Sequence, residues 1–146
     1  MSQNIILDVK NLHVEFDTYG GKVHAVRGVN FSVEKGKTLA IVGESGCGKS
    51  VTVQALMGLI PMPPGRITQG SAKLNGKELI GVSTNEINQI RGNEIGMIFQ
   101  DPMTSLNPTM TIGDQISETL RVHRGMSHHE AFKKAVELLD MTKIPE

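Results

Sequence analysis

The residues of this chain with the clearest chemistry lie between Gly43 and Ser50, where the sequence reads Gly-Glu-Ser-Gly-Cys-Gly-Lys-Ser. This is an intact G-x-x-x-x-G-K-[ST] phosphate-binding pattern. Its glycines let the backbone curl until successive N–H groups converge on phosphate oxygens, and a helix that follows adds its positive end. In such a loop the ammonium of Lys49 bridges the β- and γ-phosphates, and the hydroxyl of Ser50 is a ligand of Mg²⁺. The pattern predicts a site for a nucleoside triphosphate with Mg²⁺.

The elements on both sides of the loop have the order that this pattern requires. Residues 38–42, Thr-Leu-Ala-Ile-Val, are apolar and β-rich and predict a strand, whereas residues 51–57 predict a helix that stops near Gly58. The alternative is a chance glycine-rich turn, and the flanking strand and helix argue against it.

Composition bounds the class of protein. The chain has 146 residues, the size of one domain, with 15 basic and 15 acidic residues dispersed along it. This balance shows no electrostatic footprint for nucleic acid or anionic lipid, so we expect no nucleic-acid partner. A single cysteine fits a reducing compartment, and a polar start without an 18-residue apolar run predicts a cytoplasmic protein.

Periodicity and turn signals predict the remaining elements. A hairpin signal at Asn75-Gly76 and a capping box at residues 127–130 are the strongest of these signals. The first strand alternates from Leu7 onward, with a break predicted near Asn11. Strands are predicted at 5–16, 23–33, 70–76 and 95–99, with turns at 17–22 and 34–37, and helices at 84–91, 111–123 and 127–141.

Three stretches together carry a specific resemblance: the loop at 43–50, Ala25-Val-Arg-Gly-Val-Asn-Phe31, and the run Arg91-Gly-Asn-Glu-Ile-Gly-Met-Ile-Phe-Gln-Asp-Pro-Met-Thr-Ser-Leu-Asn-Pro108. Over essentially its whole length the chain resembles the N-terminal part of an ATP-binding cassette (ABC) transporter ATPase, most of all those that power dipeptide, oligopeptide and nickel importers. The resemblance implies an α/β P-loop NTPase fold. A RecA-like core with an N-terminal antiparallel β-subdomain is then expected in residues 1–100, and the start of a helical subdomain in residues 101–146.

The same resemblance implies roles for residues outside the loop. Gln100 matches the glutamine that reaches the γ-phosphate and Mg²⁺, and a side-chain amide suits this because it both donates and accepts. Tyr19 matches, within about one residue, the aromatic that stacks on adenine; Phe16 competes for this role, although strand parity favours it as a core residue. The expected catalytic residues are Lys49 and Gln100, and the expected Mg²⁺ ligands are Ser50 and Gln100. The expected ATP-binding residues are Tyr19, Gly43, Glu44, Ser45, Gly46, Cys47, Gly48, Lys49, Ser50 and Val51.

The function implied is uptake of peptides, or of related solutes such as nickel, driven by ATP at the cytoplasmic face of the inner membrane. The implied partners are transmembrane permease subunits, a second identical or homologous ATPase subunit and, indirectly, a solute-binding protein. The acidic strand end, its glutamate, the Leu-Ser-Gly-Gly-Gln-like helix start and the late histidine of such ATPases are not found after Gln100. We therefore expect a truncated cassette that does not turn over ATP by itself.

Two other functions remain open at this point. A shortened, non-catalytic cassette would serve as a nucleotide-binding or interaction module. The second is another phosphate-loop protein, such as a GTPase or a small-molecule kinase. A GTPase would need Asp-x-x-Gly after the loop and a later Asn-Lys-x-Asp; Asp17-Thr-Tyr-Gly20 comes before the loop, and no Asn-Lys-x-Asp exists.

Several conspicuous residues have an ordinary structural interpretation. Cys47 is interpreted as an exposed thiol with no basic partner, and the histidines 123, 128 and 129 as solvated helix-start residues, since neighbouring side chains on a helix diverge. Met57, Met97 and Met103 are predicted to fill gaps in a core or interface. By the resemblance, Met103 and Met110 are candidates for contact with the membrane partner.

Overall fold

The computed structural model describes residues 4–101 and 105–143, which fold as two compact units. The first unit comprises Met1–Ile87 and the second Asn88–Glu146. The prediction for Met103 lies outside the described residues. Among the residues described, no helix is both long and apolar enough to cross a membrane.

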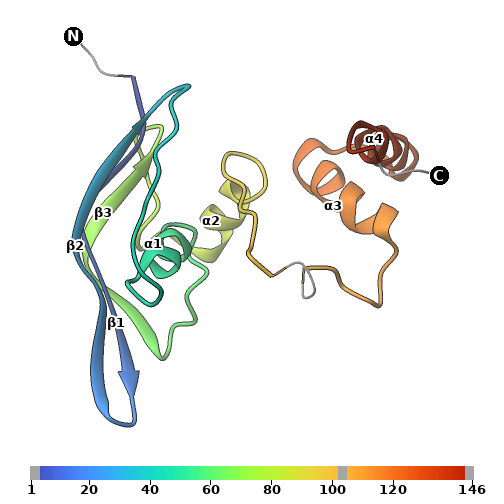
Figure 1. The fold of residues 1–146 in the computed structure, drawn as a ribbon. Coiled ribbons are helices and arrows are strands. Elements are labelled where there is room, and N and C mark those ends of the chain that lie inside the picture. Colours follow the sequence, from blue (N-terminus) through green and yellow to red (C-terminus); the bar gives the residue numbers. More distant parts are fainter. Residues whose placement is uncertain (1–3, 102–104, 144–146) are drawn as a thin grey trace. The chain divides into compact units, whose positions relative to one another are not determined.

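An antiparallel sheet forms the first unit (Figure 1). Its strands are β1 (Ile5–Thr18), β2 (Gly21–Glu34), β3 (Gly65–Leu74) and β4 (Lys77–Glu78), in the order β2-β1-β3-β4. The β1–β2 hairpin closes through Tyr19 and Gly20, and the hydroxyl of Thr18 donates to the carbonyl of Gly21 at 2.7 Å. The predicted first two strands and their turn are thus confirmed, with a tighter turn than expected.

A bulge at Asn11 interrupts β1, as the sequence predicted. Asn11 has a φ of +49°, and its N–H donates to the side-chain oxygen of Asn30 at 2.9 Å. Val9 and Leu12 would face opposite sides of a regular strand, yet they are 1% and 0% exposed. The extra residue restores the apolar side chains of the second half of β1 to the core face.

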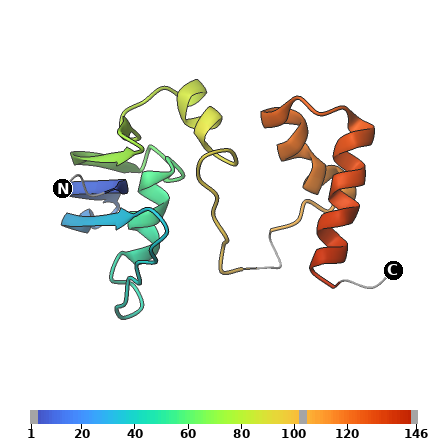
Figure 2. The ribbon, with the colours of Figure 1, turned by 90° about the horizontal axis from the view of Figure 1, so that it is seen from above.

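Helix α1 (Lys49–Leu56) lies against β1 and β2, and Figure 2 shows it beside the sheet. This confirms the helix that the sequence predicted after the phosphate loop. Its Ala55 and Leu56 are buried, and the removal of their apolar area from water favours this packing. The core of the first unit consists of Val9, Leu12, Val14, Val26, Ala55, Leu56, Met57, Ile60, Ala72, Leu74, Leu79 and Ile87.

The β3–β4 hairpin turns at Asn75-Gly76, where both residues have positive φ (+50° and +81°), as the hairpin signal predicted. The carboxylate of Glu78 holds this hairpin together. It accepts the hydroxyl of Ser71 and the N–H of Ala72 at 2.8 Å, Ile80 at 3.1 Å and Leu79 at 3.2 Å. Burial by itself would raise the pKa of Glu78, but these hydrogen bonds lower it below its ordinary value. Helix α2 (Thr84–Ile90), also predicted, spans the boundary between the units.

Helices α3 (Ile112–Arg124) and α4 (His128–Met141) pack on each other in the second unit. Thr111 caps α3 by accepting the N–H of Asp114, and α4 begins with the capping box that the sequence predicted. The start of α3 lies against Phe132 of α4: a Cβ on Gly113 would be 2.5 Å from Cε2 of that ring. Buried residues between the helices are Ser117, Ala131 and Ala135.

Two of the strand predictions, for residues 38–42 and 95–99, were wrong. Residues 38–42 and 96–99 have no strand structure, and Ile95 makes only an isolated bridge to Arg91. Their apolar side chains are accordingly open: Val42 is 91% exposed and Ile98 is 98% exposed. A buried parallel strand depends on hydrogen-bonded neighbours and on cover over both faces, and the described residues supply neither for these two segments.

Candidate nucleotide site

The phosphate loop runs from Gly43 to the start of α1, and two of its glycines occupy the left-handed region. Gly46 has a φ of +81° in a turn with open space around it, whereas Gly48 has a φ of +91° and forms the N-cap of α1. A Cβ on Gly48 would lie only 2.4 Å from the carbonyl oxygen of Ala25 on β2. Glycine at 48 therefore lets the loop backbone lie directly against the sheet.

The ammonium of Lys49 lies across this loop. Nζ donates to the carbonyl oxygens of Gly43 at 2.7 Å and Glu44 at 2.6 Å, and to Sγ of Cys47 at 3.5 Å. The structure thus brings four of the predicted site residues together around one positive charge. Cys47 is exposed, as expected, but the expectation that it has no basic partner was wrong. The loop curls enough for the side chain two positions later to reach its sulfur.

The first turn of α1 suits an anion. The early N–H groups of any helix have no carbonyl partner within it, and they carry the positive end of the helix dipole. In α1 these residues are Lys49, Ser50 and Val51; no side chain caps the turn and no acidic residue lies in it. The hydroxyl of Thr52 donates to the carbonyl of Gly48 at 2.9 Å, and Ser50 is exposed.

The two aromatic candidates for the adenine differ in their surroundings. Tyr19 is fully exposed in the β1–β2 turn. Phe16 is half-buried near the end of β1, where a Cβ on Gly65 would lie 3.0 Å from its Cε1. Strand parity predicted Phe16 as a core residue, and its side chain is partly, not fully, buried. The stacking role of Tyr19 stays a prediction.

Gln100 is exposed and belongs to the second unit, whereas the phosphate loop belongs to the first. Its approach to a γ-phosphate and to Mg²⁺ stays a prediction. Of the methionines, Met57 is 5% exposed and fills the core as expected; Met97 is half-buried and Met110 is 40% exposed.

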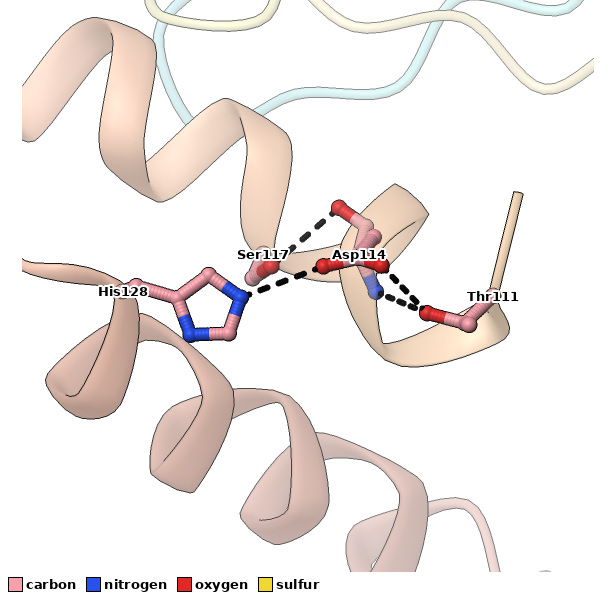
Figure 3. A network of polar contacts seen from close by, with 4 residues as sticks. All are labelled: Thr111, Asp114, Ser117 and His128. Carbon is pink, nitrogen blue, oxygen red and sulfur yellow. Dashed lines mark hydrogen bonds and ion pairs between the residues drawn. The ribbon is translucent and has the colours of Figure 1, made fainter.

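A polar network joins the two helices of the second unit (Figure 3). Oδ2 of Asp114 accepts the hydroxyl of Thr111 at 2.6 Å, Oδ1 lies 3.2 Å from Nε2 of His128, and Ser117 donates to the backbone carbonyl of Asp114 at 3.1 Å. The hydrogen bond from Thr111, followed by that from His128, lowers the pKa of Asp114. The sequence predicted His128 only as a solvated residue. His128 is exposed, but its ring also contacts Asp114 of α3 and stacks on Phe132, with 6.2 Å between the two ring centroids.

Sequence reasoning missed one further arrangement. The side-chain amide of Gln115 on α3 hydrogen-bonds to the backbone of Asn107, eight residues earlier, at 2.9 Å in both directions. An Asn-Pro pair shortly before a helix cap is the only signal that could have pointed to an ordered turn there.

Comparison with known proteins shows the family of this chain. A family model described as "ABC transporter" matches residues 26–146. The oligopeptide transport ATP-binding protein OppD of Bacillus subtilis (strain 168) is 59% identical over 140 residues, which are 96% of this chain and 39% of that protein. The dipeptide transport ATP-binding protein DppD of Lactococcus lactis subsp. cremoris (strain MG1363) is 54% identical over 147 residues, 100% of this chain and 42% of that protein.

Solved structures of ATP-binding cassettes resemble this chain as well. The ATP-binding cassette MJ0796, in a dimeric post-hydrolysis state bound to ADP and Pi, superimposes with a TM-score of 0.81 at 27% identity, over 96% of this chain and 58% of that one. CbiO1 from Clostridium perfringens gives 0.66 at 25% identity, over 97% of this chain and 51% of that one. This chain spans about two fifths of the length of its relatives OppD and DppD. Its fold is part of the expected P-loop NTPase fold, seen in the described residues as an antiparallel sheet with helices, and the chain belongs to the ABC transporter family.

Proposed function

We propose that this chain binds ATP with Mg²⁺ at residues 43–51 and is part of the ATP-binding subunit of an ABC importer. The observation that carries the proposal is the ammonium of Lys49 held across a glycine loop at the start of α1. Positive charge, a first helical turn without an acidic residue, and loop glycines in the left-handed region all fit a triphosphate.

Each predicted site residue has a place in this proposal. Lys49 exchanges the carbonyls of Gly43 and Glu44 for phosphate oxygens, which compensate its charge better than neutral carbonyls do. Ser50 supplies a hydroxyl for Mg²⁺, and Gln100 supplies an amide to the same ion and the γ-phosphate. Bound Mg²⁺ neutralises charge on the phosphates. Tyr19 stacks on the adenine, with Phe16 as the competing residue.

For the whole protein we propose ATP hydrolysis coupled to uptake of short peptides. The names of OppD and DppD, which are oligopeptide and dipeptide transport ATP-binding proteins, support this proposal, and nickel is an alternative solute. The proposed partners are permease subunits, a second ATPase subunit and, indirectly, a solute-binding protein; the dimeric state of MJ0796 supports the second subunit. The proposed location is peripheral, on the cytoplasmic face of the membrane. The relatives do not favour a non-catalytic cassette.

Replacing Lys49 by alanine tests the binding proposal. Hydrogen bonds from a charged group contribute about 1.5–3 kcal/mol, so Lys49→Ala should weaken Mg-ATP binding by about 10- to 100-fold. Lys35→Ala, at an exposed lysine in the turn after β2, is the matched control and should bind like the unaltered chain. Calorimetric titration with Mg-ATP measures both, and equal affinity of the two variants would contradict the assignment. In the whole protein, Lys49→Ala should also abolish phosphate release.

A further inference from the structure

Strand β2 carries one extra residue where it passes the phosphate loop. Val14 of β1 pairs with Val26 of β2. The next residue of β1, Glu15, pairs with His24, so the register skips Ala25. Two residues of one strand opposite one residue of the other form a β-bulge, which bends the strand and turns its groups in a new direction. The Ala25 bulge also places His24 on the face of the sheet that Glu15 occupies, opposite to the buried Val14.

The phosphate loop lies on this bulge. A Cβ on Gly48, the N-cap of α1, would be 2.4 Å from the carbonyl oxygen of Ala25 and 3.8 Å from Cγ2 of Val26. The closest approach between loop and sheet is thus made to the skipped residue and not to a regular part of β2. The direction of the Ala25 carbonyl therefore limits where the backbone of Gly48 can lie, and with it where α1 begins.

An ion pair holds the two strands together beside the bulge. Oε1 of Glu15 lies 3.0 Å from Nδ1 of His24. An ionised carboxylate can only accept hydrogen bonds, so Nδ1 of His24 is the donor. The side chain of Glu15 is only 15% exposed, and without His24 its carboxylate would lose a partner where little water replaces it. The pair therefore favours the shifted register that produces the bulge.

Arg27 holds the bulge from within β2. Its Nε donates to the backbone carbonyl of His24 at 3.2 Å. That carbonyl belongs to the peptide group between His24 and Ala25, so the side chain of Arg27 restrains the rotation of this peptide. The backbone immediately before the Ala25 carbonyl is thus fixed by one side chain of β1 and one of β2.

We propose that Glu15, His24 and Arg27 are positioning residues that hold the Ala25 bulge as the seat of the phosphate loop. The inference rests on the proposed function, because it takes the loop as the site of Mg-ATP. The three side chains act on the nucleotide through the backbone of the bulge and of Gly48. When they are lost, the first turn of α1 is no longer fixed against the sheet, and its N–H groups bind phosphate less well.

Titration of the full chain and its variants with Mg-ATP tests the effect on binding. Glu15→Ala removes the acceptor of the ion pair, and Arg27→Ala removes the donor to the backbone. Loss of one hydrogen bond should weaken Mg-ATP binding about two- to tenfold in each. Glu15→Gln keeps an oxygen that accepts from Nδ1 of His24 and should bind like the unaltered chain. The matched control is Asp8→Ala, which removes another carboxylate of β1 from its ion pair with Lys10 and should also leave binding unchanged.

Amide hydrogen exchange without nucleotide separates a seat for the loop from a general effect on stability. The N–H of Thr52 donates to the carbonyl of Gly48 at 2.9 Å in the first turn of α1. The N–H of Asn75 donates to the carbonyl of Ile6 at 2.7 Å, near the other end of β1. In Glu15→Ala the Thr52 amide should exchange about two to ten times faster, whereas the Asn75 amide should keep its rate. Arg27→Ala should give the same pattern.

Several results would overturn the inference while the proposed function stands. These are an unchanged Thr52 amide, equal acceleration of the Thr52 and Asn75 amides, unchanged Mg-ATP affinity in both alanine variants, or a loss of affinity in Asp8→Ala as large as that in Glu15→Ala. A Glu15→Gln variant as weak as Glu15→Ala would also contradict it, because the amide oxygen can still accept from His24. Failure of the unaltered chain to bind Mg-ATP would overturn the proposed function and this inference with it.

Discussion

Alanine at Gly48 and alanine at Gly46 should differ sharply in cost, although the two glycines lie two residues apart in the same loop. Both have a φ in the left-handed region, so an L-residue is strained at either position. Only Gly48 also faces backbone: its Cβ would lie 2.4 Å from the carbonyl oxygen of Ala25, whereas a Cβ on Gly46 would have no atom within 4 Å. Gly46→Ala therefore measures the strain of φ, and Gly48→Ala measures that strain plus the collision.

The magnitudes follow from these two contributions. Left-handed backbone costs an L-residue about 1–2 kcal/mol, partly offset by the lower entropy of the unfolded alanine chain, so Gly46→Ala should lose about 1 kcal/mol. Real Cβ atoms essentially never approach closer than 3.0 Å, so β2 or the loop must shift in Gly48→Ala, and overpacking of this kind costs about 1–3 kcal/mol more. For a unit of the size of Met1–Ile87, each kcal/mol lowers Tm by about 4–8 °C.

Thermal and urea unfolding followed by far-UV circular dichroism would measure both losses, and titration with Mg-ATP would show their effect on binding. Gly46→Ala should lower Tm by about 4–8 °C, and Gly48→Ala by about 8–32 °C. The m-value in urea should stay constant, because the surface exposed on unfolding is the same. Equal stability losses in the two variants would refute the reasoning, because they would mean that the N-cap of α1 does not press against Ala25.

Three further predictions concern single side chains. Tyr19→Ala should weaken Mg-ATP binding about tenfold while Tyr19→Phe changes little, because base stacking contributes about 1–3 kcal/mol; equal affinities would move the role to Phe16 or elsewhere. A bulky thiol reagent on Cys47 should block Mg-ATP binding, and prior Mg-ATP should protect the thiol, since Sγ lies 3.5 Å from the ammonium of Lys49; alkylation that leaves binding intact would show that the sulfur points away from the phosphates. The pKa of Glu78 is lowered in the folded state, so its contribution to stability is present above the ordinary value of 4.5 and is lost as pH falls below it. The stability advantage of the unaltered chain over Glu78→Gln, measured by urea unfolding, should shrink below pH 4.5, and a constant difference would show that the charge of Glu78 does not hold the hairpin.

Features that depend on neighbouring residues could be predicted from the sequence. The capping box of Ser127 and Glu130 and the Asn75-Gly76 turn each follow from side chains within a few positions of one another. The contacts of Lys49 with Gly43 and Glu44 belong with them, since these residues lie within one short segment.

Features that need a distant partner could not be predicted in the same way. Residues 38–42 and 96–99 have the composition of strands, but composition does not show whether a hydrogen-bonded neighbour is at hand. The bond from Gln115 to Asn107 was missed because a side chain that meets backbone eight residues away leaves no periodic signal. The collision at Gly48 likewise depends on Ala25, which lies on another strand.

The bulge at Asn11 has a consequence for how this sheet can change over generations. Beside it, Gly28 on β2 and Gly70 on β3 also have positive φ, and a Cβ on Gly70 would lie 2.6 Å from the carbonyl oxygen of Asn11. All three neighbouring strands are thus irregular at this point. Deleting the extra residue from β1 alone would put β1 out of register with both β2 and β3. The bulge at Asn11 and the glycines at 28 and 70 should therefore be retained or lost together in proteins that descend from a common ancestor.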